Sequence, residues 1–205
     1  MLWRHGRTAW NDENRFQGTT DVPLDAIGIG QAERAARLVA AFPPDAVVSS
    51  DLERARQTAA PLLALTGIEA AYDEGLRETY GGRWQGLVTS QIEAMDPELW
   101  AAWRRGEDVP AGGGEMRHEV ADRACTVVAK SLDSLGPERT LVVVTHGGTA
   151  RSIIGRMLDL PSDRWGVLGG LANCAWSVLE EANTGWRLSE HNAGSLPEPV
   201  VGDDR

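Results

Sequence analysis

Short runs of β-branched and other apolar residues alternate with longer segments of helical periodicity along most of the chain. The clearest run is 141–144, four consecutive apolar residues that lead through Thr145 into a helical segment opened by glycine. A continuous apolar run of this length is typical of a strand buried on both faces. Strands that alternate with helices form a parallel sheet covered by helices. We therefore expect an α/β fold, a three-layer α/β/α sandwich with a mostly parallel sheet and an antiparallel edge.

The same patterns indicate where the elements begin and end. Asp25 is the expected N-cap of the first long helix, and Ser90 and Glu93 form the S-x-x-E pattern of a capping box. The last two strands are expected to turn at 183–185. Segment 106–114 contains three consecutive glycines without a following GK[ST] motif, which favours a flexible loop over a phosphate-binding loop. Strands are expected at 2–4, 46–49, 70–72, 140–145, 174–179 and 186–190, and helices at 28–41, 52–65, 115–134 and from 90, 96 and 147 onward.

The length of 205 residues suits one domain of ordinary size. We expect this domain to cover residues 1–191. From 192 to 205 the chain is rich in proline, glycine and acidic residues and lacks apolar periodicity, so we expect a flexible tail there.

The charge and composition of the chain limit its partners. It has 30 Asp and Glu against 20 Lys and Arg, a formal net charge of −10. Such a chain gains no counterion-release free energy on DNA or RNA, so we expect no nucleic-acid partner. No apolar run approaches the ~18 residues of a membrane span, which predicts no membrane partner. Cys125 and Cys174 lie far apart without a CxxC pattern, so we expect thiols, a cytoplasmic location and no metal site.

Basic side chains follow three of the expected strands. Arg4 and His5 close the first strand, His146 follows the most apolar strand, and Arg54 lies in the first helical turn after the second strand. The carboxyl ends of neighbouring parallel strands meet at one edge of a sheet, where open α/β folds bind ligands. Helix N-termini add positive potential at that edge. The sequence therefore predicts one anion site built from these residues.

Hydrolysis of a phosphate ester needs more than an anion site. It requires a nucleophile and an acid that protonates the departing alkoxide. Glu78 follows an expected strand and precedes a glycine-rich bend. We take Glu78 as the candidate acid, with an ordinary solvated loop carboxylate as the alternative.

Four motifs together resemble one known family. Their order and spacing are similar to those of the histidine phosphatase superfamily, also called phosphoglycerate-mutase-like, over residues 2 to about 190. The resemblance implies the α/β/α fold of that superfamily. The motifs are RHG at 4–6, SSDLERARQTA at 49–59, LRETYGGRWQGL at 76–87 and THGG at 145–148.

The resemblance also implies a role for each matching residue, without a metal or other cofactor. His5 is the nucleophile that becomes a phosphohistidine, and a hydrogen bond from its other ring nitrogen to a backbone carbonyl is expected to fix its tautomer. Glu78 is the proton donor and then the base for the attacking water, and the phosphate dianion favours its protonated form. The phosphoryl oxygens are bound by Arg4, Arg54 and His146, with Asn11 and the Gly147 N–H as further donors, and Gln17 and Gly18 line the substrate entrance.

Three functions are compatible with such a site: a phosphatase, a cofactor-dependent phosphoglycerate mutase and a catalytically silent binding module. The mutases usually have Glu or Gln and then Ser after RHG, whereas this chain has Arg7 and Thr8. The segment after Glu78 is also too short for the insertion that encloses the bisphosphate in mutases. We favour the phosphatase, since His5, Glu78 and His146 are all present. Arg7 is either an additional anion contact or exposed.

The expected substrate is a small phosphorylated metabolite. Segments 168–177 and 186–192 are similar to those of superfamily phosphatases that act on glucosyl-3-phosphoglycerate. Sugar phosphates, phosphoglycerate and α-ribazole phosphate are further candidates, and both a monomer and a homodimer are compatible with the sequence. With the nucleophile at position 5, the first strand has only about three residues, fewer than usual, so we expect the natural chain to begin upstream.

Overall fold

A mixed sheet forms the middle layer of the molecule. The computed structural model describes residues 1–194. Its strands lie side by side in the order β3-β2-β4-β1-β5-β6, and β1, β2, β3 and β4 pair in parallel. β5 is antiparallel to β1, and β6 is antiparallel to β5, so the predicted antiparallel edge is confirmed. The strands are β1 (Leu2–Arg4), β2 (Ala46–Ser49), β3 (Ala70–Tyr72), β4 (Leu141–Thr145), β5 (Trp176–Ala182) and β6 (Gly185–Ala193).

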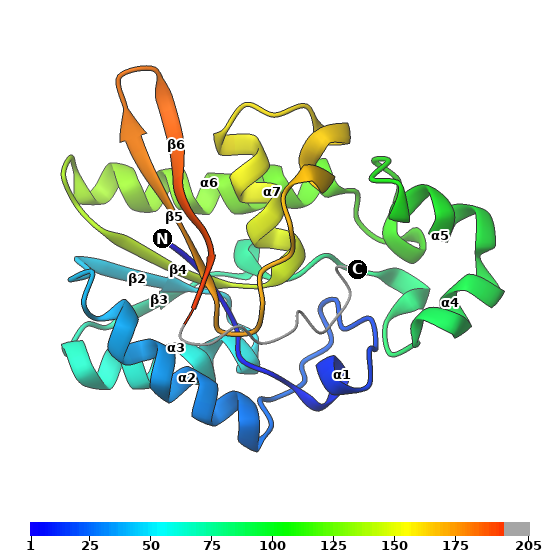
Figure 1. Ribbon diagram of the computed structural model, residues 1–205, viewed down its shortest axis with the longest axis horizontal. Coiled ribbons are helices and arrows are strands. Elements are labelled where there is room, and N and C mark those ends of the chain that lie inside the picture. Colours follow the sequence, from blue (N-terminus) through cyan, green and yellow to red (C-terminus); the bar gives the residue numbers. More distant parts are fainter. Residues whose placement is uncertain (195–205) are drawn as a thin grey trace.

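Helices cover both faces of the sheet (Figure 1). α2 (Ala26–Val39) and α3 (Glu53–Thr66) pack on one face, and α6 (Arg117–Leu135) and α7 (Gly147–Met157) pack on the other. The predicted three-layer sandwich is therefore confirmed. α4 (Thr89–Met95) and α5 (Pro97–Arg104) form an insertion beside the sheet. The shorter helical segments are α1 (Ala9–Asp12) and the 3-10 turns at Glu74–Leu76, Gly82–Trp84, Ala111–Gly113 and Ser162–Val167.

The two faces of β4 enter two separate cores. Val142 and Val144 join the core beneath α2 and α3, which also contains Trp3. Leu141 and Val143 join the core beneath α6 and α7. The run of apolar residues without a polar interruption is explained by this position, because both faces of a central strand are covered by helices.

The last two strands differ from the expected ones at their ends. β5 begins at Trp176 instead of 174, because Cys174 has a positive φ of 59° and donates its backbone N–H to His5 O outside the ladder. β6 continues to Ala193. Asn192, where the tail is expected to begin, lies in this strand, and its Oδ1 accepts a hydrogen bond from the loop before β5 at 2.7 Å. The rest of that tail, 195–205, lies outside the described residues.

One of the two predicted helix caps is wrong. Asp25 caps α2, since its Oδ1 accepts a hydrogen bond from the third helical residue at 2.7 Å. α4 begins one residue earlier than expected, so Ser90 and Glu93 do not form the capping box. The side chain of Gln91 reaches back and accepts a hydrogen bond from Val88 N at 3.1 Å. The other helix boundaries lie within two residues of those expected.

The insertion around α4 and α5 has its own apolar cluster. The rings of Trp84 and Trp100 pack edge to face with centroids 5.5 Å apart, and Phe16 is buried beside them. Ala111 belongs to the same cluster and is 0% exposed, although it lies in the segment expected to be a flexible loop. That segment instead packs against the protein.

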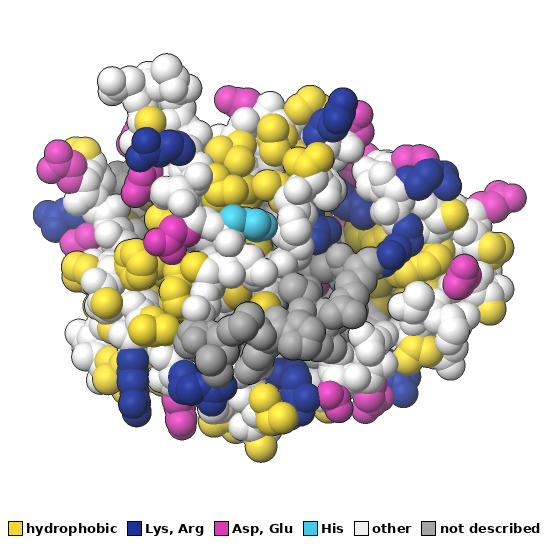
Figure 2. All heavy atoms as spheres, viewed as in Figure 1, with side chains coloured by type: hydrophobic (Ala, Val, Ile, Leu, Met, Phe, Trp, Pro, Cys, Tyr) yellow, Lys and Arg dark blue, Asp and Glu magenta, His cyan; other side chains and the backbone are white. Residues whose placement is uncertain are grey.

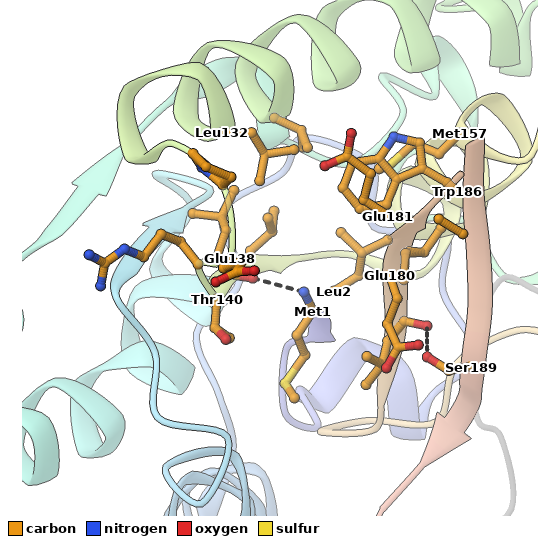
Figure 3. A pocket seen from close by; sticks show the side chains of 18 of the residues that line it. Met1, Leu2, Leu132, Glu138, Thr140, Met157, Glu180, Glu181, Trp186 and Ser189 are labelled. Carbon is orange, nitrogen blue, oxygen red and sulfur yellow. Dashed lines mark hydrogen bonds between the residues drawn. The ribbon is translucent and has the colours of Figure 1, made fainter. Parts of the chain in front are cut away.

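A cavity of about 1360 Å³ opens at the amino-terminal edge of the sheet (Figure 3). It lies between the end of α6 and the β5–β6 hairpin, with Leu132 and Trp186 in its walls. The Met1 ammonium borders this cavity and donates a hydrogen bond to Leu141 O at 2.8 Å. The lining residues include none of the predicted site residues. This cavity is therefore separate from the predicted anion site, which belongs to the carboxyl edge.

The surface is mixed in character. Hydrophobic side chains gather over α7 and beside β6 on the face shown in Figure 2, and charged side chains lie towards its rim. Among the helices of residues 1–194, we find none with both the length and the apolar character that crossing a membrane requires.

Candidate active site

The strand ends bring their basic side chains together at the carboxyl edge of the sheet. Arg4 ends β1 and is followed by His5, and His146 follows the neighbouring strand β4. The rings of the two histidines have centroids 5.1 Å apart. Arg54, from the first turn of α3, contacts His146. All four side chains are at most 3% exposed, so the structure assembles the predicted residues into one buried site.

The imidazole of His5 is neutral, with its lone pair on Nε2. Nδ1 lies 2.7 Å from Gly6 O, and because a carbonyl oxygen only accepts, Nδ1 carries the proton. The predicted hydrogen bond to a backbone carbonyl is thus confirmed. Burial, and then the charges of Arg54 and Arg4, hold the pKa of His5 well below its usual 6.5. Nε2 is therefore available as a nucleophile at neutral pH.

Arg54 is held on three sides. Its Nε donates to His146 Nδ1 at 3.2 Å, and its two terminal nitrogens donate to Thr20 O at 2.8 Å and Gly18 O at 2.7 Å. His146 Nε2 lies 2.9 Å from Ser50 Oγ. Because a guanidinium only donates, His146 accepts at Nδ1 and carries its proton on Nε2. The contacts of Ser50 and Thr20 were not predicted from the sequence, because they arise only when three distant segments fold together.

Asn11 offers a buried amide donor to the site. Its Oδ1 accepts hydrogen bonds from Thr8 N at 3.1 Å and Asn173 Nδ2 at 3.2 Å. Asn11 Nδ2 is buried and has no hydrogen-bond partner among the described residues. A buried donor without a partner is costly, and an anionic oxygen would satisfy it. Asn173 also donates to His5 O at 3.2 Å, a contact that the similarity of segment 168–177 did not specify.

Gln17 and Gly18 lie in the wall of the site. Gln17 is buried, and its Oε1 accepts a hydrogen bond from Thr8 Oγ1 at 3.0 Å. Gly18 has a positive φ of 54°, and a Cβ there would lie 2.2 Å from Gln85 Oε1. Only glycine therefore fits at 18 with its carbonyl directed at Arg54. Contact of either residue with the substrate stays a prediction.

The Glu78 carboxylate lies at the N-terminus of α7. Its Oε2 accepts a hydrogen bond from Gly148 N at 2.9 Å, and its Oε1 accepts from Thr149 N at 3.1 Å and Thr79 N at 2.8 Å. A Cβ at position 148 would lie 2.7 Å from Glu78 Oε1, so this approach needs glycine. Glu78 is thus a positioned carboxylate and not a solvated loop residue. Gly147, the first residue of α7, is buried next to His146, and its contact with the substrate stays a prediction.

The two N-terminal arginines have different surroundings. Arg4 is 3% exposed and donates from Nη1 to Leu171 O. Arg7 donates from Nε to Asp25 Oδ2 at 2.8 Å and from Nη1 to Asp12 Oδ1 at 2.7 Å. Arg7 is therefore only partly exposed and already pairs with two carboxylates, which disfavours an additional anion contact.

The cysteines and acidic residues show no metal or redox site in the described part of the chain. Cys125 and Cys174 form no disulfide there, and burial raises the pKa of the Cys125 thiol to about 11. No group of three or more His, Cys, Asp and Glu side chains in residues 1–194 is arranged to hold a metal ion.

Comparison with known proteins identifies the family. The family model of the histidine phosphatase superfamily (branch 1) matches residues 1–194. The chain belongs to the histidine phosphatase superfamily. This histidine phosphatase is 36% identical to the glucosyl-3-phosphoglycerate phosphatase of Mycolicibacterium vanbaalenii, with 95% of this chain and 94% of the relative covered. It is 37% identical to the glucosyl-3-phosphoglycerate phosphatase of Mycobacterium tuberculosis, with the same coverage.

A solved structure shares the fold of this histidine phosphatase. A mycobacterial glucosyl-3-phosphoglycerate phosphatase in complex with VO3 superposes with a TM-score of 0.88 at 39% identity, covering 94% of this chain and 98% of that chain. The predicted superfamily and its phosphoglycerate-mutase-like fold are confirmed. The prediction of a phosphatase enzyme is confirmed at the level of this family.

Proposed function

We propose that this histidine phosphatase hydrolyses a small phosphate monoester of the phosphoglycerate type, and that glucosyl-3-phosphoglycerate is its substrate. His5 acts as the nucleophile and Glu78 as the proton donor. The observation that carries the proposal is the neutral His5 imidazole, whose Nδ1 is bound to Gly6 O and whose Nε2 is left for attack among buried guanidinium groups.

The first half-reaction transfers the phosphoryl group to His5. The Nε2 lone pair attacks phosphorus, a P–N bond forms and the P–O bond to the leaving group breaks. Negative charge on the equatorial oxygens is stabilised by Arg4, Arg54 and the Asn11 Nδ2 donor, which are held in place before the substrate arrives. Glu78 transfers a proton to the departing alkoxide, so the alcohol leaves neutral.

The second half-reaction releases phosphate. Glu78, now a carboxylate, takes a proton from a water molecule that attacks the phosphohistidine. The new P–O bond forms, the P–N bond breaks, and His5 returns to its neutral state. One carboxyl group thus acts first as an acid and then as a base, so the site needs a single well-positioned glutamate.

The substrate assignment is supported by the two mycobacterial relatives, which are named glucosyl-3-phosphoglycerate phosphatases and match nearly all of this chain. The mutase alternative requires a second phosphoryl group in the site. Arg7, the one sequence candidate for an additional anion contact near RHG, is bound by Asp12 and Asp25. We therefore assign a single phosphoryl-binding site to this chain.

A phosphate-release screen tests the proposal. Glucosyl-3-phosphoglycerate, 3-phosphoglycerate, sugar phosphates and α-ribazole phosphate are compared by kcat/KM. A preference for glucosyl-3-phosphoglycerate of about several hundredfold supports the assignment, because such selectivity requires specific contacts. A spread of about threefold indicates a generalist phosphatase and contradicts it. Interconversion of phosphoglycerates without phosphate release, on addition of a bisphosphate, identifies a mutase instead.

The cellular location and the oligomeric state of the enzyme are also part of this proposal. We place the enzyme in the cytoplasm, because thiols such as Cys125 persist in a reducing compartment. A homodimer stays a prediction, and light scattering of the purified protein distinguishes it from a monomer.

A further inference from the structure

Arg123 on α6 binds the backbone of the segment that carries Glu78. One terminal nitrogen donates to Gly75 O at 2.8 Å and Arg77 O at 2.7 Å, and the other donates to Glu78 O at 3.0 Å. Three carbonyl groups from a stretch of four residues thus point to one guanidinium. The planar fork of an arginine suits this arrangement, because several donors are fixed relative to one another.

Glu115 holds Arg123 from the end of the α4–α5 insertion. Its Oε1 accepts from Arg123 Nε at 2.8 Å, and its Oε2 accepts from Arg123 Nη2 at 2.9 Å. The same Oε2 accepts from Tyr80 N at 2.7 Å, and Glu115 N donates to Tyr80 O at 2.9 Å. Burial opposes ionisation of Glu115, but hydrogen bonds from Arg123 and Tyr80 hold its pKa below the usual 4.5. We call these two residues the Arg123–Glu115 clamp.

Glu78 is therefore held from two sides. Helix α7 binds its carboxylate through Gly148 N and Thr149 N, while the clamp binds its backbone from α6. A proton donor must lie within hydrogen-bond reach of the leaving oxygen. A misplacement of about 1 Å can lower a rate by about a hundredfold, so the backbone position matters as much as the carboxylate.

We propose that the Arg123–Glu115 clamp positions Glu78 for proton transfer, and that it is needed mainly for esters with poor leaving groups. Both are positioning residues, since they act through the backbone of segment 75–80. The inference rests on the proposed role of Glu78. It also links the insertion to the chemistry, because Glu115 ends the insertion and contacts Tyr80 through both backbone and side chain.

The test compares two substrates with different leaving groups in Arg123→Met and Glu115→Gln. p-Nitrophenolate departs without a proton, whereas the alkoxide of glucosyl-3-phosphoglycerate requires one. For Arg123→Met we expect kcat/KM for glucosyl-3-phosphoglycerate to fall about 100-fold, and that for p-nitrophenyl phosphate to fall less than about threefold. Glu115→Gln keeps an acceptor for Tyr80 N but loses the charge, so we expect the same selectivity with a loss of about tenfold.

Arg156→Met is the matched control. Arg156 Nη2 pairs with Asp122 Oδ1 at 2.7 Å, joining α7 to α6 one residue away from Arg123 in sequence. Arg156 does not bind the Glu78 segment in the described structure. We expect unchanged kcat/KM for both substrates. A selective loss in Arg156→Met as well assigns the effect to helix packing and overturns the inference.

Glu78→Gln distinguishes failure of this inference from failure of the proposed function. Equal losses on both substrates in Glu78→Gln mean that Glu78 is not the acid, and the proposed function fails on that point. A selective loss in Glu78→Gln together with equal losses in Arg123→Met means that the clamp supports only the fold, which overturns this inference alone. If Arg123→Met does not fold, as thermal unfolding will show, the substrate ratio of Glu115→Gln decides.

Discussion

Arg54 Nε lies 3.2 Å from His146 Nδ1, and both side chains are fully buried. Because the guanidinium only donates, this contact excludes a proton on Nδ1. Burial, and then the charge of Arg54, hold the pKa of His146 well below its usual 6.5. Both histidines of the site are thus neutral at neutral pH before substrate binds. The positive potential of the phosphate site comes from Arg4 and Arg54, which remain charged.

Arg54→Lys is expected to lower kcat/KM by about 10²- to 10³-fold, because an ammonium cannot contact Gly18 O, Thr20 O and His146 Nδ1 together. Steady-state kinetics on the best substrate measure this loss. Arg56→Lys is the control on the same helix, since Arg56 lies 4.1 Å over the ring of Tyr72 and outside the site. A value for Arg54→Lys within about threefold of wild type contradicts the account of a preorganised guanidinium.

The free energy of unfolding is expected to fall as the pH drops below 6.5. His5 and His146 have folded-state pKa values well below 6.5, whereas they take up protons near that pH in the unfolded chain. The unfolded state then binds more protons, so the contribution of these two histidines to the stability is complete above that pH and declines below it, until the folded-state pKa values are reached. For two such groups the slope approaches about 2.7 kcal/mol per pH unit. Urea unfolding between about pH 5 and 6 measures the slope of the histidines. Burial lowers the pKa of the Met1 ammonium from 8.0 to about 6, so this group adds its own slope at higher pH.

Single variants check which histidines produce this slope. His5→Gln removes one of the two groups, so the slope is expected to halve to about 1.4 kcal/mol per pH unit. His118→Gln is the control, because the side chain of His118 is 44% exposed and pairs with Asp108 at the surface. An unchanged slope in His5→Gln refutes the assignment of buried neutral histidines.

Gly148→Ala is expected to displace the proton donor. The new Cβ would lie 2.7 Å from Glu78 Oε1, so the carboxylate must move away from the N-terminus of α7. We expect kcat/KM for glucosyl-3-phosphoglycerate to fall about tenfold or more, with a smaller loss on p-nitrophenyl phosphate. Gly166→Ala provides the comparison, since no atom lies within 4 Å of a Cβ built there. Equal kcat/KM values of Gly148→Ala and wild type would contradict the described position of the Glu78 carboxylate at the N-terminus of α7.

Asn11→Asp is expected to reduce phosphate binding. Asn11 Nδ2 is a buried donor without a partner in the described structure, and the substitution replaces it with a charge that repels a phosphoryl oxygen. We expect the inhibition constant of inorganic phosphate to rise about tenfold or more, and Asn11→Ala to have an intermediate effect. Inhibition by phosphate in a steady-state assay measures both. Wild-type inhibition in Asn11→Asp shows that this donor faces no phosphoryl oxygen.

The sheet and the residues at its carboxyl edge could be predicted from the sequence, because local pattern and topology coincide there. The apolar run of β4 predicted a central strand, and a parallel sheet then required Arg4, His5 and His146 to lie at one edge. The order of four motifs was enough to predict the superfamily. None of these inferences needs the position of a side chain.

The remaining contacts depend on side chains that meet only in the folded protein. Ser50 reaches His146 across 96 positions of sequence, and Arg123 reaches Glu78 across 45, so no local spacing reveals either pair. The prediction of the α4 cap was wrong for a related reason. Val88 N donates a hydrogen bond to the Gln91 side chain, although valine itself has no side chain that can cap a helix. A capping-box pattern that requires serine at the cap position does not include this arrangement.

The central claim is that His5 forms a covalent phosphoenzyme. The most direct measurement is the amount of covalently bound label after turnover of a ³²P-labelled phosphate ester. The enzyme is denatured rapidly without acid during turnover, and portions of the denatured chain are then treated with acid or with alkali. We expect label on the wild-type chain that is lost in acid and stable in alkali, as is typical of a phosphohistidine. We expect no label on His5→Ala. Label retained on His5→Ala would contradict the central claim. Absence of trapped label in Glu78→Gln would also contradict it when the substrate is labelled p-nitrophenyl phosphate, because this leaving group needs no proton and only the release of the phosphoryl group should be slowed.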